Sequence, residues 1–182
     1  MSPIELRLAR LEAESEIRRL AASYCFDIDD REIARIAALF TDEACVRSAD
    51  GVMNATGREA IMSMYEGRFA ALGPGAHYTH DHWIDLSSFE EGRARGRVTG
   101  HAELERNGQM MVCALRYDDV YHKGEIGWQF AERVIQFLYY VPVGEYEGIL
   151  LTRDRNRAYA DPRPADYPEQ LPNWHAYGNG QT

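Results

Sequence analysis

The stretch His77-Tyr78-Thr79-His80-Asp81-His82-Trp83-Ile84-Asp85-Leu86 predicts the first strand of a β-sheet. The segments that follow have a similar composition. They are rich in Val, Ile, Tyr, Trp and Thr, and short turn signals separate them. The predicted strands are 76–88, 92–106, 109–122 and 126–142. Successive strands joined by such short turns predict an antiparallel meander.

The first seventy residues instead carry helical patterns. Ser2-Pro3-Ile4-Glu5 has the form of a capping box with proline at the first helical position. Apolar residues then recur at three- or four-residue steps. The predicted helices are 2–24, 31–40 and 57–71, and a short strand is predicted around 44–48. Helices followed by strands indicate an α+β fold, not α/β.

A chain of 182 residues is long enough for one well-cored domain and short for two. We expect a single domain over residues 1–150. Residues 151–182 contain four prolines in a polar stretch with several aromatic residues, which predicts a C-terminal tail or an arm that docks on a neighbour.

The net charge of −9 argues against nucleic acid and against anionic membrane surfaces as partners. The N-terminus lacks the apolar core of a signal peptide, and no apolar run reaches the length of a membrane span. Cys25, Cys45 and Cys113 are widely spaced and predict free thiols. These features favour a soluble cytoplasmic protein.

The chemical lead is the pair Asp29 and His77, which lie 48 positions apart. Asp29 is expected near the end of the first helix, and His77 opens the first long strand. A carboxylate that orients an imidazole can turn it into a general base at neutral pH. Strict alternation would place Asp81 and Trp83 on the His77 face, as part of a pocket wall.

Other interpretations of these residues remain open. A histidine beside an aspartate is often only a structural hydrogen bond, and Asp27 or Asp30 is an alternative partner. His80 and His82, predicted on one strand face, would allow a metal site, but no third ligand is evident and we expect none. The alternating arginines 93, 95 and 97 fit a solvated sheet face or an interface.

Several segments, in their order, resemble the SnoaL-like branch of the NTF2-like superfamily, with scytalone dehydratase and hexachlorocyclohexane dehydrochlorinase among its members. The resemblance covers roughly residues 5–140. It rests on Ile17-Arg18-Arg19-Leu20, Tyr24, Asp29, Leu39-Phe40-Thr41-Asp42-Glu43-Ala44, Gly57-Arg58-Glu59-Ala60-Ile61, His77 and Gly127-Trp128-Gln129-Phe130.

This resemblance implies a cone in which helices pack on a curved antiparallel sheet and enclose a pocket. It implies His77 as the base, Asp29 as its partner, no cofactor, and a homo-oligomer, either trimer or dimer. Tyr24 stands at a pocket position, and His101 lies near the strand position of a second family histidine. The chain departs from the dehydratase pattern at Ile28 and at Val46-Arg47-Ser48, where tyrosines would be expected.

The predicted function is therefore a cofactor-independent lyase or isomerase acting on a small cyclic or aromatic-like substrate. Tyr24, Asp81, Trp83 and His101 are the predicted substrate-binding residues. A buried, neutral Asp81 is one hypothesis for the group that stabilises an enolate. The alternatives are a non-catalytic small-molecule-binding module of the same fold and the β-subunit of an aromatic-ring dioxygenase.

Overall fold

The N-terminal helix α1 (Pro3–Asp29) begins at a complete capping box. The Ser2 hydroxyl accepts a hydrogen bond from the Glu5 amide at 3.3 Å, and the Glu5 carboxylate accepts one from the Ser2 amide at 2.6 Å. The helix continues past its predicted end at residue 24, because its sheet-facing side stays buried as far as Ile28. Asp29 therefore lies in the last turn of α1.

The computed structural model describes residues 1–159 and 161–177. After α1 the elements are α2 (Ile33–Ala38), β1 (Phe40–Ser48), β2 (Asn54–Thr56), α3 (Arg58–Phe69), β3 (Leu72–Asp85), η1 (Phe89–Glu91), β4 (Arg93–Arg106), β5 (Gln109–Gly124), β6 (Gly127–Pro142), η2 (Val143–Glu145), η3 (Ile149–Leu151) and α4 (Trp174–Tyr177). Every predicted helix and strand has a counterpart. No helix within the described ranges is long and apolar enough to cross a membrane.

The strands form one curved six-stranded sheet in the order β2-β1-β6-β5-β4-β3. The predicted meander β3–β6 is antiparallel throughout. However, β1 pairs with β6 in parallel, so the sheet is mixed where a purely antiparallel one was predicted. The reason is that β1 comes from the helical half of the chain and enters beside the last strand, not beside a hairpin partner. The α+β class is confirmed.

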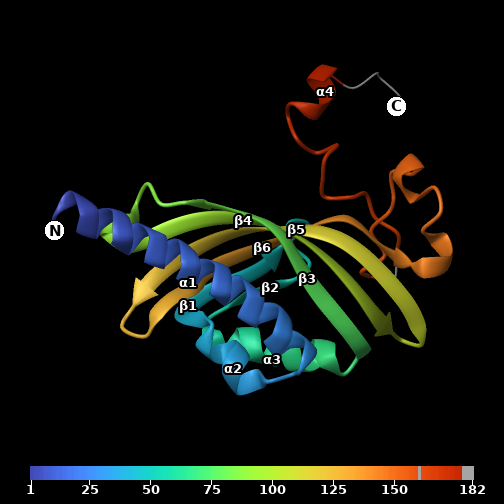
Figure 1. Ribbon diagram of the computed structural model, residues 1–182. Helices are drawn as coiled ribbons and strands as arrows, with labels where there is room; N and C mark the ends of the chain where they lie inside the picture. The colour runs from blue at the N-terminus through green and yellow to red at the C-terminus, as the bar shows by residue number, and fades with distance from the viewer. Residues whose placement is uncertain (160, 178–182) are drawn as a thin grey trace.

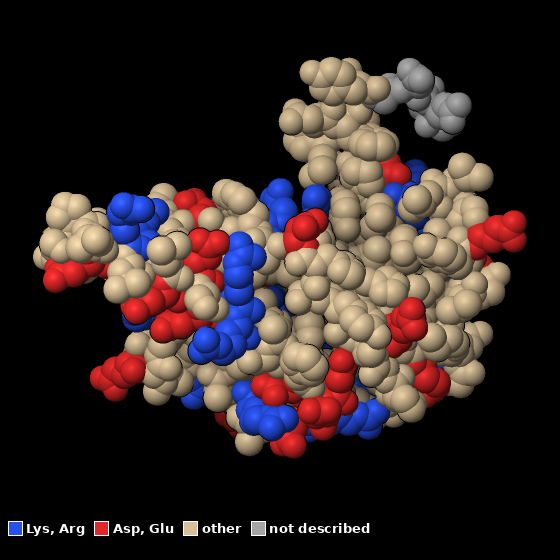
Figure 2. All heavy atoms as spheres, viewed as in Figure 1, with Lys and Arg blue, Asp and Glu red and all other residues tan. Residues whose placement is uncertain are grey.

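The helices α1, α2 and α3 cover one face of this sheet, and α1 runs obliquely over the strands (Figure 1). The main core lies between that face and the helices. On the surface viewed in Figure 2, acidic and basic side chains are interspersed. The interior between the helices and the sheet is therefore apolar.

A register shift between Thr79 and His82 interrupts the pairing of β3 with β4. His77 faces the helices before this bulge, and His82 and Ile84 do so after it. The predicted alternation over 77–85 is therefore wrong beyond Thr79, because a bulge adds a residue and exchanges the two faces. The bulge therefore places Asp81 and Trp83 on the face of the sheet opposite to that of His77.

Gly96 on the inner face of β4 lies against the side chains of Tyr121 and His82. A Cβ atom added at Gly96 would lie 2.9 Å from the ring of Tyr121 and 3.1 Å from His82 Nε2. We expect Gly96→Ala to lower the free energy of unfolding by about 1–3 kcal/mol, the usual cost of overpacking. Urea denaturation measures this loss. Gly67→Ala is the control, since its Cβ would meet nothing within 4 Å and alanine is favoured in a helix.

The chain after β6 first packs against its own sheet. Asn156 pairs with Tyr140 of β6, and Asp166 exchanges hydrogen bonds with Phe137 at 2.7 and 2.9 Å. Beyond this segment, α4 projects away from the body (Figure 1). Part of the predicted arm thus binds its own chain, and docking of the rest on a neighbour stays a prediction. Residues 178–182 lie outside the described residues.

Candidate active site

Asp29 and His77 make two hydrogen bonds. Asp29 Oδ1 lies 2.6 Å from His77 Nδ1, and Asp29 Oδ2 accepts the His77 backbone amide at 2.8 Å. Each side chain is about 20% exposed. The two-point contact fixes the position of the imidazole, and an ionised carboxylate requires that Nδ1 carries the hydrogen. Nε2 is then the nitrogen free to take a proton.

The neighbouring aspartates have other partners. Asp27 lies 2.8 Å from Arg35 Nε, and Asp30 lies 3.5 Å from the same guanidinium. These contacts remove both alternative partners for His77. The contact predicted between Asp29 and His77 is present, and its catalytic role stays a prediction.

His77 borders an apolar cavity of ≈ 50 Å³. Its lining comes from α1, α3 and the inner face of the sheet: Tyr24, Ile28, Met53, Tyr65, Arg68, Phe69, Leu72, His77, Leu104, Cys113, Leu115, Tyr117, Ile135, Phe137 and Tyr140. Ligand sites in proteins usually reach 300 Å³ or more, whereas this space holds only a few water molecules. A ligand of that size would fit only if some of the lining side chains moved.

Tyr24 is the predicted substrate-binding residue that lines the cavity. Its hydroxyl lies 2.9 Å from the hydroxyl of Tyr65, which the sequence reasoning missed. Burial is the main cause that raises the pKa of Tyr65 well above its ordinary value, so this phenol stays protonated. One hydroxyl hydrogen joins the two oxygens, and the second is left to donate toward a ligand.

The other predicted binding residues do not line the cavity. Asp81 is exposed, which contradicts the hypothesis of a buried neutral acid. Trp83 is 64% exposed and borders a surface groove with Arg95 and Arg97, on the face turned away from the helices. The bulge after Thr79 is the physical reason, because it reverses the alternation on which both placements depended.

His101 also lies on the outer face, where it stacks on Tyr78 with a centroid distance of 6.0 Å. His80 is nearby, at 6.4 Å from His101. His82 points inward instead, so the prediction that His80 and His82 share a strand face is wrong. The arginines at 93, 95 and 97 are exposed on the outer face, as a solvated sheet face requires.

A buried ion pair next to the cavity was not predicted. Arg133 donates to both oxygens of Asp119 at 2.9 and 2.8 Å, and both side chains are fully buried. The guanidinium carbon lies 4.0–4.2 Å from the ring centroids of Tyr24, Tyr117 and Phe130. Burial lowers the pKa of Arg133, but Asp119 more than offsets this and the net pKa is raised. A permanent cation thus stands behind the aromatic wall of the cavity.

Two buried cysteines, Cys113 in the cavity lining and Cys25 on α1, have thiols of low reactivity. Burial raises the pKa of Cys113 to about 12 and that of Cys25 to about 11. Both thiols are therefore protonated at neutral pH, and a thiolate is the form that attacks. Burial therefore disfavours both cysteines as nucleophiles.

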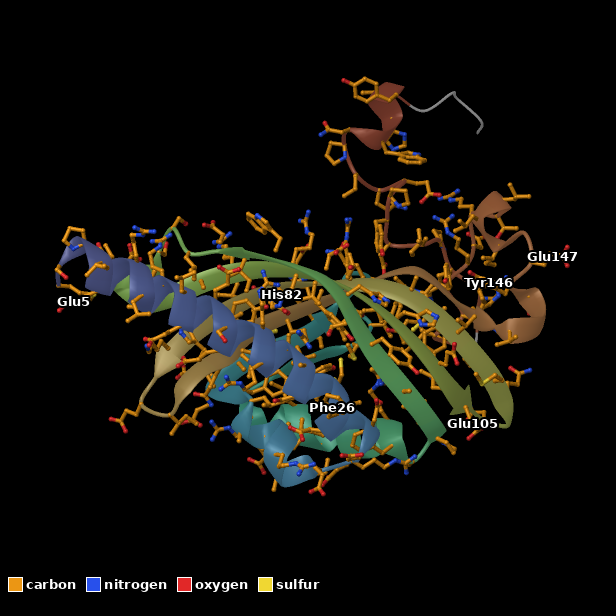
Figure 3. The ribbon with its side chains drawn as sticks, in the orientation of Figure 1. Glu5, Phe26, His82, Glu105, Tyr146 and Glu147 are labelled. Carbon is orange, nitrogen blue, oxygen red and sulfur yellow. The ribbon has the colours of Figure 1, made fainter. Side chains whose placement is uncertain are left out.

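Tyr121 extends the ion pair toward α1. Its hydroxyl donates to Asp119 at 2.9 Å and lies 3.1 Å from His82 Nε2. His82 lies where α1 crosses the sheet (Figure 3), and burial lowers its pKa from 6.5 to about 4. Folding therefore favours neutral His82, while the unfolded chain binds a proton below pH 6.5.

We expect this difference to weaken the fold as the pH falls from 6.5 to 4. Asp166 acts in the opposite direction, because burial raises its pKa from 3.8 to about 6 and folding favours its protonated form. A His82→Gln variant removes only the first effect, so its free energy of unfolding should fall less than that of wild type over this range. Urea denaturation at both pH values tests this, and equal slopes for the two proteins would contradict it.

The comparisons with known proteins agree with this architecture. The model of the SnoaL-like domain family matches residues 9–134. The chain belongs to the SnoaL-like domain family. The predicted membership in the SnoaL-like branch of the NTF2-like superfamily is thus confirmed, and so is the cone of helices on a curved sheet. No curated protein matches the sequence at a significant level.

Three solved structures illustrate the shared fold. A protein from Novosphingobium aromaticivorans, provisionally assigned as a scytalone dehydratase, is 23% identical with a TM-score of 0.66, over 76% of this chain and 91% of that one. Hexachlorocyclohexane dehydrochlorinase LinA type 2 is 18% identical (TM-score 0.70; 75% and 93%). LinA type 3 from Novosphingobium barchaimii LL02 is 19% identical (TM-score 0.69; 76% and 95%).

Proposed function

We propose that this SnoaL-like protein is a cofactor-independent lyase or isomerase with His77 as its general base and Asp29 as the partner that orients it. The observation that supports this most directly is the 2.6 Å contact between the two side chains at the wall of an apolar cavity. An imidazole held by a carboxylate, facing an apolar space, is suited to removing a proton from carbon.

In an elimination, His77 Nε2 takes a proton from a substrate carbon. The electron pair of that C–H bond forms the new double bond, and the leaving group departs from the adjacent carbon with its bonding electrons. If hydroxide leaves, the imidazolium can return the proton to it as water forms. In an isomerisation the same proton returns to a different carbon. Asp29 stabilises the imidazolium in both reactions.

An activating carbonyl needs a donor to stabilise the enolate that develops. The Tyr24–Tyr65 pair has one hydroxyl hydrogen to offer, and both residues line the cavity together with His77. The Arg133 cation lies behind the ring of Tyr24. This arrangement supports a cyclic or aromatic-like substrate that carries a carbonyl or another polar acceptor.

The names of two similar structures, a provisionally assigned dehydratase and a dehydrochlorinase, denote the loss of water and of hydrogen chloride. Both are eliminations, and they support the lyase half of the proposal. The small cavity of ≈ 50 Å³ supports a second candidate, a small-molecule-binding module that performs no chemistry.

A screen for both binding and turnover distinguishes the two. Wild type and His77→Gln are incubated in D₂O with cyclic ketones, hydroxylated naphthalenones and steroid-like compounds. Mass spectrometry follows deuterium uptake and loss of water, and thermal shift follows binding. Turnover that requires His77 supports the enzyme. Binding by both proteins without turnover in either would replace it by the binding module.

A further inference from the structure

Four residues form one row across the sheet beneath the cavity. His77 pairs with Ala102, Ala102 with Cys113, and Cys113 with Tyr140. His77 and Tyr140 therefore stand three strand spacings apart, roughly 14 Å along the sheet. The two residues between them have small side chains, so they form a low floor. The cavity thus has His77 on one wall and Tyr140 on the opposite one.

The hydroxyl hydrogen of Tyr140 is left free to donate, although Arg106 approaches the hydroxyl oxygen as a donor. The residue is 2% exposed, and its Oη has no hydrogen-bond partner among the described residues. Buried polar atoms without a partner are uncommon in folded proteins. Burial is the main cause that raises the pKa of this phenol, so the hydroxyl stays protonated and can donate. Its ring borders the same cavity as His77.

Two guanidinium groups lie close to this hydroxyl. Arg68, in the last turn of α3, lines the cavity, and its Nη1 lies 3.2 Å from the thioether of Met53, a weak acceptor. The guanidinium carbon of Arg106 lies 5.9 Å from the Tyr140 ring centroid. Over the described part of the chain, neither arginine has a carboxylate within 4.0 Å, although the protein's net charge is −9.

Glu105, the acidic neighbour of Arg106 on β4, forms no ion pair within 4.0 Å with either arginine in the described part of the chain. Glu105, labelled at the β4–β5 end of the sheet in Figure 3, accepts a hydrogen bond from the Gly108 amide. This end of the cavity therefore combines a hydroxyl donor with two nearby arginines that form no ion pair in the described part of the chain. A neutral apolar ligand would use neither feature.

We infer that the Tyr140 end of the cavity binds an oxyanion of the substrate, a carboxylate or phenolate, while His77 acts on carbon at the other end. The inference rests on the proposed function and narrows its substrate class to anionic cyclic compounds. The Tyr140 hydroxyl donates to the oxyanion, and Arg68 leaves the Met53 thioether to pair with it. Movement of Arg68 also enlarges the cavity.

Matched acid and amide probes test this without any turnover. Benzoate and 2-naphthoate are compared with benzamide and 2-naphthamide by isothermal titration calorimetry. We expect wild type to bind at least one acid about tenfold more tightly than its amide, the effect of one charge-assisted hydrogen bond. Tyr140→Phe should weaken acid binding about tenfold, and Arg68→Gln should remove the preference for the acid.

Arg93→Gln is the matched control, because it removes one exposed arginine from the outer face and should leave the preference unchanged. His77→Gln separates the two proposals. The acid preference should persist in His77→Gln, whether or not wild type shows turnover. That result would support the oxyanion site independently of the catalytic base. Equal affinities for acid and amide in wild type, or no binding of either acid, would overturn it whatever the fate of the base.

Discussion

Replacing His77 by glutamine is expected to lower kcat/KM for the proposed reaction by about 10²–10⁴-fold, the usual contribution of a general base. Glutamine is polar and similar in length, so the cavity wall is preserved while the basic nitrogen is lost. The loss should appear in kcat, because the base interacts with the transferring proton only in the transition state. Steady-state kinetics on a substrate from the screen measures it.

Asp29→Asn tests the partner separately. An asparagine can turn its NH₂ group toward Nδ1, which favours the tautomer with the hydrogen on Nε2 and removes the base. We expect a loss of at least about 10²-fold in kcat. His175→Gln, an exposed histidine of α4, is the control for losing an imidazole elsewhere. Full activity in His77→Gln would eliminate the dyad as the catalytic base.

Removing the carboxylate of Asp119 is expected to cost about 3–5 kcal/mol of unfolding free energy, because it leaves a buried guanidinium without a counter-charge. Arg133 has no exposed side-chain surface, and the aromatic rings around it cannot replace the two hydrogen bonds that it donates to Asp119. Urea denaturation of Asp119→Ala measures the loss.

Two variants make this test specific. Asp118→Ala removes the neighbouring carboxylate, which pairs with Arg97 on the partly exposed outer face, and should change stability by no more than about 1 kcal/mol. Asp119→Leu combined with Arg133→Met removes both charges and should recover most of the loss. An equal loss of unfolding free energy in Asp118→Ala and Asp119→Ala would contradict a larger contribution from the buried pair.

Much of the architecture is encoded locally. The capping box at Ser2, the three-to-four-residue apolar period of α1 and the turn at Asn107-Gly108 each act over a few residues. Such signals predict the type and order of elements without knowledge of their packing. The partnership of Asp29 with His77 was also predictable, because the resemblance carried both positions and the sequence placed His77 at the start of the predicted strand 76–88.

The placement of two predicted binding residues relied on deciding which face of the strand each side chain occupies. Asp81 and Trp83 were predicted beside His77 from strict alternation, and one bulge in β3 reversed it. A bulge is a property of two paired strands. Nothing within residues 77–85 marks the extra residue, because it appears only when β3 is laid against β4.

The sequence by itself determined the α+β class, the order of the elements and the pair that could act as base and partner. Only the tertiary structure decided which side chains of the sheet face the cavity. Adjacent residues of a strand point to opposite faces, but pairing with Asp119 across β5 and β6 is what buries Arg133. Likewise, Tyr140 faces His77 because four strands align them in one row, and this register arises from pairing between distant segments.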